Sequence, residues 1–277
     1  MKKIVFIIAL SLHSFSGTFM SSTGSYFKKS EVNVRVASNS SCSNAGTNVQ
    51  ELIEYITPAI ENYWNEVTTS RLELINGKEL NTTDALFSNG KICVNQSTTV
   101  SCVGVSNPIP KVTDIVIACN DNVDNYSIGG GSPSSVIAIT LPNNILGSNI
   151  VGAIILINDT ASSPFSSLTE EDKIAVLAHE IGHAIGIGHT TNNANLMFWT
   201  PTPERFALGP DDVQALTYLY PKKFDGCGIG GTIKDSSGPD DPNYLLGFLF
   251  GLMLSFFFVL TFIRSQKFFL KFKKPII

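Results

Sequence analysis

The chain has 277 residues, of which 43% are hydrophobic and 15% are charged, and its formal net charge is −4. This length suits one sizeable domain or two small ones. Lys2, Lys3 and the five cations of residues 264–277 supply seven positive charges, so residues 4–263 carry a net charge of −11. Because nucleic-acid binding needs a basic surface, this acidic segment argues against a nucleic-acid partner.

The first segment, MKKIVFIIALSLHSFSG, has a basic start, an apolar run over residues 4–12 and small residues directly after it. This order is typical of a secretory signal peptide, which we place at residues 1–20. A membrane anchor is the alternative, but the apolar run is too short for a bilayer that needs about 20 residues. We therefore expect an exported domain.

Hydrophobic periodicity predicts a mixed α/β domain over residues 31–221. The predicted strands are 32–36, 71–76, 91–94, 99–104, 114–119, 136–140 and 151–157. The predicted helices are 48–66, 169–187 and 211–219. Strand 151–157 is apolar on both faces, so we expect it at the centre of the sheet. We expect Pro142 to end strand 136–140.

The composition changes after residue 221. Residues 222–243 are rich in glycine, which is typical of a flexible stalk. Residues 244–263 are 20 positions without a charge, the length of a transmembrane helix. The basic residues 264–277 predict a cytoplasmic tail, with the domain outside the membrane. A buried core helix would show a polar face, which this segment lacks, and a sorting signal removed after export is the other interpretation.

Export favours disulfide bonds among the cysteines. The five are Cys42, Cys93, Cys102, Cys119 and Cys227. An odd number leaves at least one cysteine free or bonded between chains. Cys93 and Cys102 could close a hairpin, and Cys119 is a competing partner. No C-x-x-C pair occurs, which argues against a cysteine zinc site.

The stretch HEIGHAIGIGH, residues 179–189, carries the strongest chemical signal. Residues four apart lie on one face of a helix, so His179 and His183 can bind the same metal ion. Imidazole nitrogens suit zinc. Glu180 lies beside His179 and is better placed to reach a water near the metal, which is the H-E-x-x-H arrangement with a glutamate general base.

Two glycines follow the helical pair. Gly186 and Gly188 allow a left-handed conformation that ends the helix and turns the chain back, which makes His189 a third ligand. A structural zinc is usually closed by four protein ligands, whereas a catalytic one keeps an open position. The chain has four histidines, and His13 lies in the signal peptide, so no fourth histidine closes this site.

The motif HEIGHAIGIGH fits H-E-x-x-H-x-x-G-x-x-H, the signature of the metzincin metalloproteases. Met197, in NLMFW, resembles the methionine of the Met-turn as it is spaced in the matrixin branch. Other segments are similar to the first matrixin helix, the glycine-rich loop with the edge strand, the next strand and the last helix: 56–74, 131–142, 151–159 and 208–221. The resemblance covers most of residues 31–221. It implies the metzincin-like zincin fold, a twisted mixed sheet with an active-site helix and a C-terminal helix.

The resemblance also implies roles for single residues. It implies one catalytic Zn²⁺ on the three histidines, with Glu180 as general base and Met197 as a hydrophobic floor that makes no bond to the metal. It implies that a protein or peptide substrate lies extended along the edge strand and adds a strand by main-chain hydrogen bonds. The expected substrate-binding residues are Val136, Ile137, Ala138, Ile139 and Thr140.

The chain departs from the family pattern in several places. Cys42 is not in a cysteine-switch motif, so latency by that route is not expected. The edge strand has no histidine, so a second, structural zinc is not expected. Asp121 and Asp124 could hold structural Ca²⁺, but a solvated acidic loop is the favoured interpretation. The specificity wall that residues 198–208 would carry also differs from the family.

We expect a zinc-dependent endopeptidase that acts outside the cell and is held at the membrane by one C-terminal helix. One alternative is a catalytically silent adhesin or scaffold on the same fold. Another is a zinc hydrolase that acts on amides other than peptides.

Overall fold

The computed structural model describes residues 17–19 and 24–222, apart from residues 39, 83, 89, 91, 95, 98–99, 102–108 and 200–205. The predicted transmembrane segment 244–263, the tail 264–277, the stalk beyond Lys222 and most of the predicted signal peptide lie outside these residues. Within the described part, no helix combines the length and the apolar character needed to cross a membrane.

The described strands form one main sheet and two pairs of short strands. The main sheet has the order β3-β2-β6-β8-β7. Its strands are β2 (Glu31–Ala37), β3 (Glu73–Leu80), β6 (Asp114–Asn120), β7 (Ala138–Leu146) and β8 (Asn149–Asn158). The short pairs are β1 (Gly17–Phe19) with β9 (Ile187–Thr190) and β4 (Gln96–Ser97) with β5 (Val100–Ser101).

The direction of the strands confirms the mixed α/β prediction. Strands β3, β2, β6 and β8 run parallel, and β7 runs antiparallel to β8 at the edge. Strand β8 lies between β6 and β7, which confirms the central position predicted from its apolar faces. Strand β6 is buried along its whole length, as expected for a strand covered on both faces.

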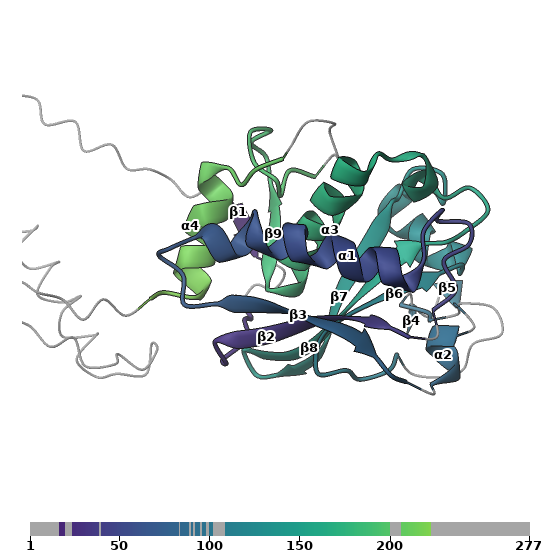
Figure 1. Ribbon diagram of the computed structural model, residues 1–277, viewed down its shortest axis with the longest axis horizontal. Coiled ribbons are helices and arrows are strands. Elements are labelled where there is room, and N and C mark those ends of the chain that lie inside the picture. Colours follow the sequence, from purple (N-terminus) through teal and green to yellow (C-terminus); the bar gives the residue numbers. More distant parts are fainter. Residues whose placement is uncertain are drawn as a thin grey trace, which may run out of the picture. The chain divides into compact units, whose positions relative to one another are not determined.

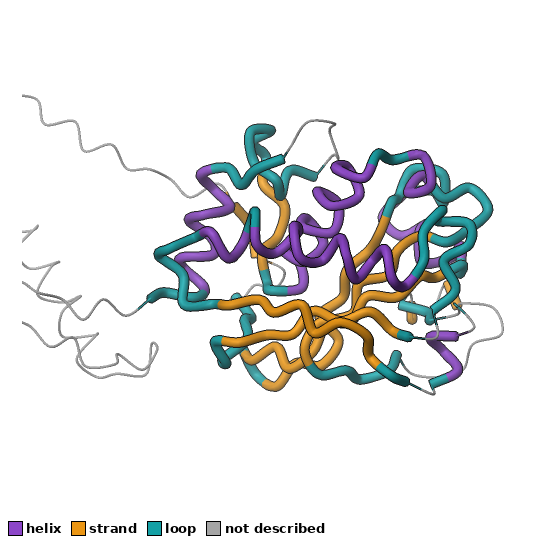
Figure 2. The backbone as a smooth tube through the Cα atoms, viewed as in Figure 1, coloured by secondary structure: helices purple, strands orange, loops and turns teal. Residues whose placement is uncertain are grey.

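The two long helices lie on the same side of the sheet (Figures 1 and 2). The described α-helices are α1 (Val49–Glu61), α2 (Ala85–Ser88), α3 (Glu170–Ala184) and α4 (Pro210–Leu219). Helix α1 begins at Asn48, whose side chain accepts the backbone N–H of Glu51 and so satisfies a donor that the helix itself leaves unpaired. Helix α3 packs against α1, β7 and β8.

A large apolar core fills the space between these helices and the sheet. Its largest buried side chains include Leu52, Ile56 and Ile60 of α1, which pack with Leu177 and Ile181 of α3. A smaller core on the other side of β6 and β8 has as its members Ala37, Phe87, Ile92, Val112, Val116, Ala118, Ile154 and Leu156. The active-site helix is therefore supported by a sheet that is buried on both faces.

The prediction that Pro142 ends the edge strand was wrong. Pro142 lies inside β7 opposite Ala153, and the register shifts between it and Asn144. Proline is tolerated in a strand at a sheet edge or at a bulge, where no neighbour needs its missing N–H. The edge position of β7, which only the resemblance to the matrixins implied and the prediction for Pro142 did not take into account, explains the difference.

The ends of other elements differ from their predicted positions by a few residues. The helix predicted over 48–66 ends at Glu61 and is followed by a separate 3₁₀ turn, Trp64–Glu66. The strand predicted near 91–94 is not found, because residues 92–94 have no regular structure and the two-residue strand β4 begins only at Gln96. The strand predicted near 99–104 overlaps the two-residue strand β5, and residues 102–104 lie outside the described part.

One disulfide joins Cys42 to Cys119, across 77 positions of the sequence. Cys119, which we considered as a partner for the pair in the hairpin, therefore bonds to a cysteine in the loop before α1 instead. Cys93 is also disulfide-bonded. The bond between Cys42 and Cys119 ties that loop to the end of the buried strand β6.

Candidate metal centre

Helix α3 carries the first two histidines and is fixed at its start and in its middle. The side chain of Thr169 accepts the N–H of Asp172 and caps the helix. Further along, the indole Nε1 of Trp64 donates to the carbonyl oxygen of Ala178 at 2.8 Å. The turn that contains His179 is thus tied to the segment that follows α1.

The helix ends at Ala184, three residues before the predicted end, because Gly186 adopts φ = +102°. A Cβ at this position would lie 2.1 Å from the backbone oxygen of Ser25, so no other residue type fits without a backbone shift. The hydroxyl of Tyr220 donates to the carbonyl of Ile185 at 2.7 Å and accepts the N–H of Phe27. The chain then turns into β9, which brings His189 back towards the helix.

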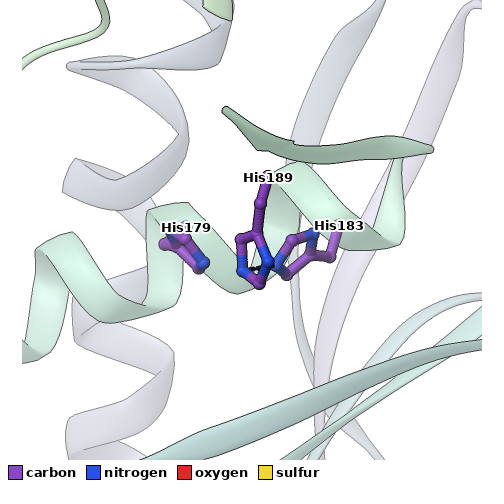
Figure 3. A group of neighbouring side chains, drawn as sticks. All are labelled: His179, His183 and His189. Atoms are coloured by element: carbon purple, nitrogen blue, oxygen red, sulfur yellow. Dashed lines mark hydrogen bonds between the residues drawn. The ribbon is translucent and has the colours of Figure 1, made fainter. Parts of the chain in front are cut away.

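The three histidines of the motif converge as predicted (Figure 3). One ligand atom from each of His179, His183 and His189 lies within 4.8 Å of the other two. The Nε2 atoms of His183 and His189 are 3.0 Å apart. His183 is buried, with 7% of its surface exposed, whereas His189 is exposed.

Backbone carbonyls orient two of the imidazole rings. Nδ1 of His179 lies 2.8 Å from the oxygen of Leu196, and Nδ1 of His183 lies 2.8 Å from the oxygen of Ile187. A carbonyl can only accept, so each Nδ1 carries the proton and each Nε2 presents a lone pair towards the shared centre. Facing lone pairs repel unless a proton or a cation lies between them. Two rings fixed in this way, together with the ring of His189, form a group that fits a zinc ion.

Electrostatics favour the neutral, ligating form of the buried histidine. Burial lowers the pKa of His183 well below its ordinary value, and the neighbouring His179 and His189 lower it further. The pKa of His189 is lowered by burial and by His179. Rings that resist protonation are available as metal ligands.

The side chain of Glu180 reaches the edge strand. This side chain is buried, and its Oε2 accepts a hydrogen bond from the hydroxyl of Thr140 at 2.5 Å. Burial raises the pKa of the Glu180 carboxyl, while the electrostatic interaction with the neighbouring His179 and the Thr140 hydrogen bond lower it. A carboxyl group placed in this way beside a metal site can take up and release a proton.

Met197 packs against helix α3 at Gly182. It is buried, and a Cβ built on Gly182 would come within 2.4 Å of its sulfur and 2.7 Å of the Trp64 ring. Asp212 of α4 accepts the N–H groups of Leu196 and Met197, at 2.7 and 3.2 Å, and so holds this turn. In the sequence, Asp212 is one residue of the predicted helix 211–219, and no motif indicates this role.

The predicted substrate-binding residues lie at the start of the edge strand. Ala138, Ile139 and Thr140 belong to β7, while Val136 and Ile137 precede it. The carbonyl of Ile137 accepts the N–H of Asn158, and the side-chain amide of Asn158 donates to the carbonyl of Val136. Strand β7 is the outer strand of the main sheet, so one backbone edge faces away from β8.

The loop that carries Asp121 and Asp124 is organised by side-chain amides. Asn120 accepts from the backbone of Asn122 and from the side chain of Asn125, and Tyr126 donates to the carbonyl of Asn120. Within the described residues, the histidine group is the one His/Cys/Asp/Glu cluster with the geometry to hold a metal. Calcium at Asp121 and Asp124 stays a prediction.

Comparison with known proteins agrees with this geometry. Residues 113–221 match the sequence profile of the matrixin family, Peptidase_M10. This part of the chain is therefore similar to a matrixin domain. Matrixins are zinc-dependent, and the three-histidine group is the part of this domain that fits zinc.

Three relatives show the extent of the similarity. A probable matrix metalloproteinase (095L) of invertebrate iridescent virus 3 is 44% identical over 48 residues, human matrix metalloproteinase-26 is 39% identical over 51, and matrix metalloproteinase-18 of Xenopus laevis is 44% identical over 50. Each alignment covers 17% of this chain and 13%, 20% and 11% of the respective relative. The chain therefore shares only a short stretch with each of them and spans far less than two thirds of their length.

Proposed function

We propose that this protein is a zinc-dependent endopeptidase. The observation that carries the proposal is the convergence of three imidazole Nε2 atoms beside a buried glutamate. His179, His183 and His189 supply three ligand atoms within 4.8 Å of one another, and three protein ligands with one open position are typical of catalytic zinc.

Each residue of the site has a defined task in peptide hydrolysis. Zinc held by the histidines would acidify a water molecule and polarise the scissile carbonyl. Glu180 would take the proton from the attacking water on a carboxylate oxygen and pass it to the leaving amine. The carbonyls of Leu196 and Ile187 hold the rings of His179 and His183, so their Nε2 atoms keep the ligating direction.

The substrate of the proposed reaction is an extended peptide. The outer edge of β7 can pair with a peptide main chain by adding a strand to the sheet. The residues proposed to line this edge are Val136, Ile137, Ala138, Ile139 and Thr140. A peptide bound there would run past the turn of α3 that carries Glu180, because Thr140 contacts that residue.

We further propose that the enzyme acts outside the cell, tethered by the helix predicted at residues 244–263. Support for export comes from the signal-like sequence of residues 1–20 and from the disulfide between Cys42 and Cys119. Peptide mapping of the protein in membrane and medium fractions tests the tether and both chain ends.

The decisive experiment is a peptide-library digestion by the exported protein, with and without a chelator. Wild-type protein should cleave the library, and the chelator should abolish cleavage. Glu180→Gln should keep the zinc and lose nearly all activity, whereas Glu171→Gln, at an exposed position of the same helix, should stay near wild type. Undiminished turnover by zinc-loaded Glu180→Gln would show that Glu180 is not the general base. Absence of cleavage by the zinc-loaded wild type would instead favour the adhesin or the non-peptide amidase.

A further inference from the structure

The contact between Thr140 and Glu180 joins two parts of the site that the sequence keeps 40 residues apart. The Thr140 hydroxyl oxygen is 2.5 Å from Oε2 of Glu180 and 3.2 Å from its backbone oxygen. A hydroxyl has one proton to donate, and the shorter, charge-assisted contact is the stronger of the two. The hydrogen bond therefore goes mainly to the carboxylate.

Both ends of this hydrogen bond are held by the fold. Thr140 pairs with Ile155 in the β7–β8 ladder, and Glu180 lies in the body of α3, which packs on β7. Threonine is β-branched, so its χ1 rotation is restricted on a strand. The hydroxyl thus reaches Glu180 from a nearly fixed direction and determines which carboxylate oxygen is occupied.

The side chain and the backbone of Thr140 serve different partners. Side chains alternate between the two faces of a strand. Ile139 packs against the smaller core, while Thr140 faces the active-site helix. The backbone at this position remains in the edge strand that we propose for the substrate. The hydroxyl can therefore be removed without changing the atoms that would pair with a peptide.

We propose that Thr140 is a positioning residue that holds Oε2 of Glu180 and leaves Oε1 directed at the attacking water. This inference rests on the proposed function, because it assigns a task to the base of that reaction. It also links peptide binding to the orientation of the Glu180 carboxylate, since β7 serves both. The correct position of β7 against α3 is then required for catalysis as well as for peptide binding.

Two substitutions at Thr140 separate this role from a structural one. Thr140→Val keeps the shape and removes the hydroxyl, and Thr140→Ser keeps the hydroxyl. With zinc bound, Thr140→Val should lower kcat by about tenfold to a hundredfold, the effect of a misplaced catalytic group, while KM and zinc content stay near wild type. Thr140→Ser should recover most of kcat. Thr217→Val is the matched control, because its hydroxyl donates to Val213 in α4, away from the site.

A double-mutant cycle and a structure complete the test. In the Glu180→Gln background, Thr140→Val should change the residual rate little, since the group it positions is already gone. In a crystal structure of zinc-loaded Thr140→Val, the Glu180 carboxylate should turn from its wild-type orientation.

The outcomes distinguish this inference from the proposed function. A Thr140→Val protein with wild-type kcat, a change confined to KM, or loss of zinc would each overturn the positioning role while peptidase activity stands. If the zinc-loaded wild type cleaves nothing, the proposed function fails, and the crystal structure still decides whether Thr140 orients Glu180. An unmoved carboxylate in that structure would overturn the inference.

Discussion

The indole Nε1 of Trp64 donates a 2.8 Å hydrogen bond to the carbonyl oxygen of Ala178, the residue directly before the first histidine of the motif. Both residues are almost fully buried. Trp64 belongs to the 3₁₀ turn that follows α1, and Ala178 belongs to α3, so the bond joins this turn to α3 next to the first histidine of the metal centre. The same indole ring also lies against Gly182.

Trp64→Phe removes the indole N–H that makes this bond, together with the five-membered part of the ring. We expect a loss of about 1–2 kcal/mol in the free energy of unfolding, because a buried carbonyl loses a partner, and Trp64→Ala should cost about 3–5 kcal/mol through the cavity it leaves. Urea unfolding of the zinc-loaded proteins measures both. Equal stability of Trp64→Phe and wild type would show that the hydrogen bond contributes nothing.

Gly182→Ala should destabilise the protein, although alanine is the better helix former by about 1 kcal/mol. The added Cβ would meet the Met197 sulfur at 2.4 Å and the Trp64 ring at 2.7 Å, and overpacking of this kind costs about 1–3 kcal/mol. In a Met197→Ala background the loss should be smaller, because the sulfur is gone. A more stable Gly182→Ala protein would contradict the packing described for this turn.

Zinc should raise the thermal stability of the domain. At free zinc 1,000 times above Kd, the gain is about 4 kcal/mol, and a chelator should remove it. His189→Ala should abolish this shift while leaving the unfolding temperature of the metal-free protein near wild type, since His189 is exposed. Calorimetric scans with and without zinc make the comparison. An undiminished zinc shift in His189→Ala would remove His189 from the ligand set.

Loss of the Cys42–Cys119 bond should cost about 4 kcal/mol, because it closes a long loop across 77 positions. The double variant Cys42→Ser/Cys119→Ser tests this by urea unfolding under non-reducing conditions. Addition of a reductant should lower the stability of the double variant less than that of the wild type. A reductant effect of the same size in both proteins would place the stabilisation at another disulfide.

Asp159→Asn should change how stability depends on pH. Burial raises the pKa of the Asp159 carboxyl above 3.8, the nearby Asp121 adds to this, and hydrogen bonds from Ala45 and Asn44 oppose it. The folded state therefore binds this proton more tightly than the unfolded state. The contribution of the group to stability is present at low pH and is lost as the pH rises above about 4.

The measurement is the difference in unfolding free energy between Asp159→Asn and wild type. It should grow in favour of the variant from about pH 4 upward and level off above the folded-state pKa. Glu66→Gln, which removes the same charge at an exposed position, is the control. A difference that shrinks with rising pH would show that Asp159 is stabilised as a carboxylate.

The sequence predicts the parts of the site that local geometry determines. His179 and His183 are one helical turn apart, and Gly186 allows the chain to change direction before His189. Short-range rules therefore bring the three rings together. The central position of β8 followed from its apolar character on both faces. None of these inferences required knowledge of a distant contact.

The contacts that support the site depend on residues far apart in the chain. The pair Thr140 and Glu180 is separated by 40 positions, and Trp64 and Ala178 by 114. No periodicity or motif predicts such pairs, because they arise when a strand or turn packs on the active-site helix. The prediction for Pro142 was wrong for the same reason, because whether a strand tolerates a proline depends on which strand becomes the edge of the sheet.

The support of α3 by Trp64, Ser25 and Tyr220 has a consequence for any attempt to shorten the protein. The segment that matches the matrixin profile begins at residue 113, but Trp64 and Ser25 precede it, as do strands β2 and β3. A fragment limited to the matched residues would keep every proposed metal ligand and lose Trp64 and Ser25, which contact helix α3 and the turn that follows it. We therefore expect the matched segment not to fold by itself, and a shortened protein that keeps these contacts must include Ser25 and the residues that follow it.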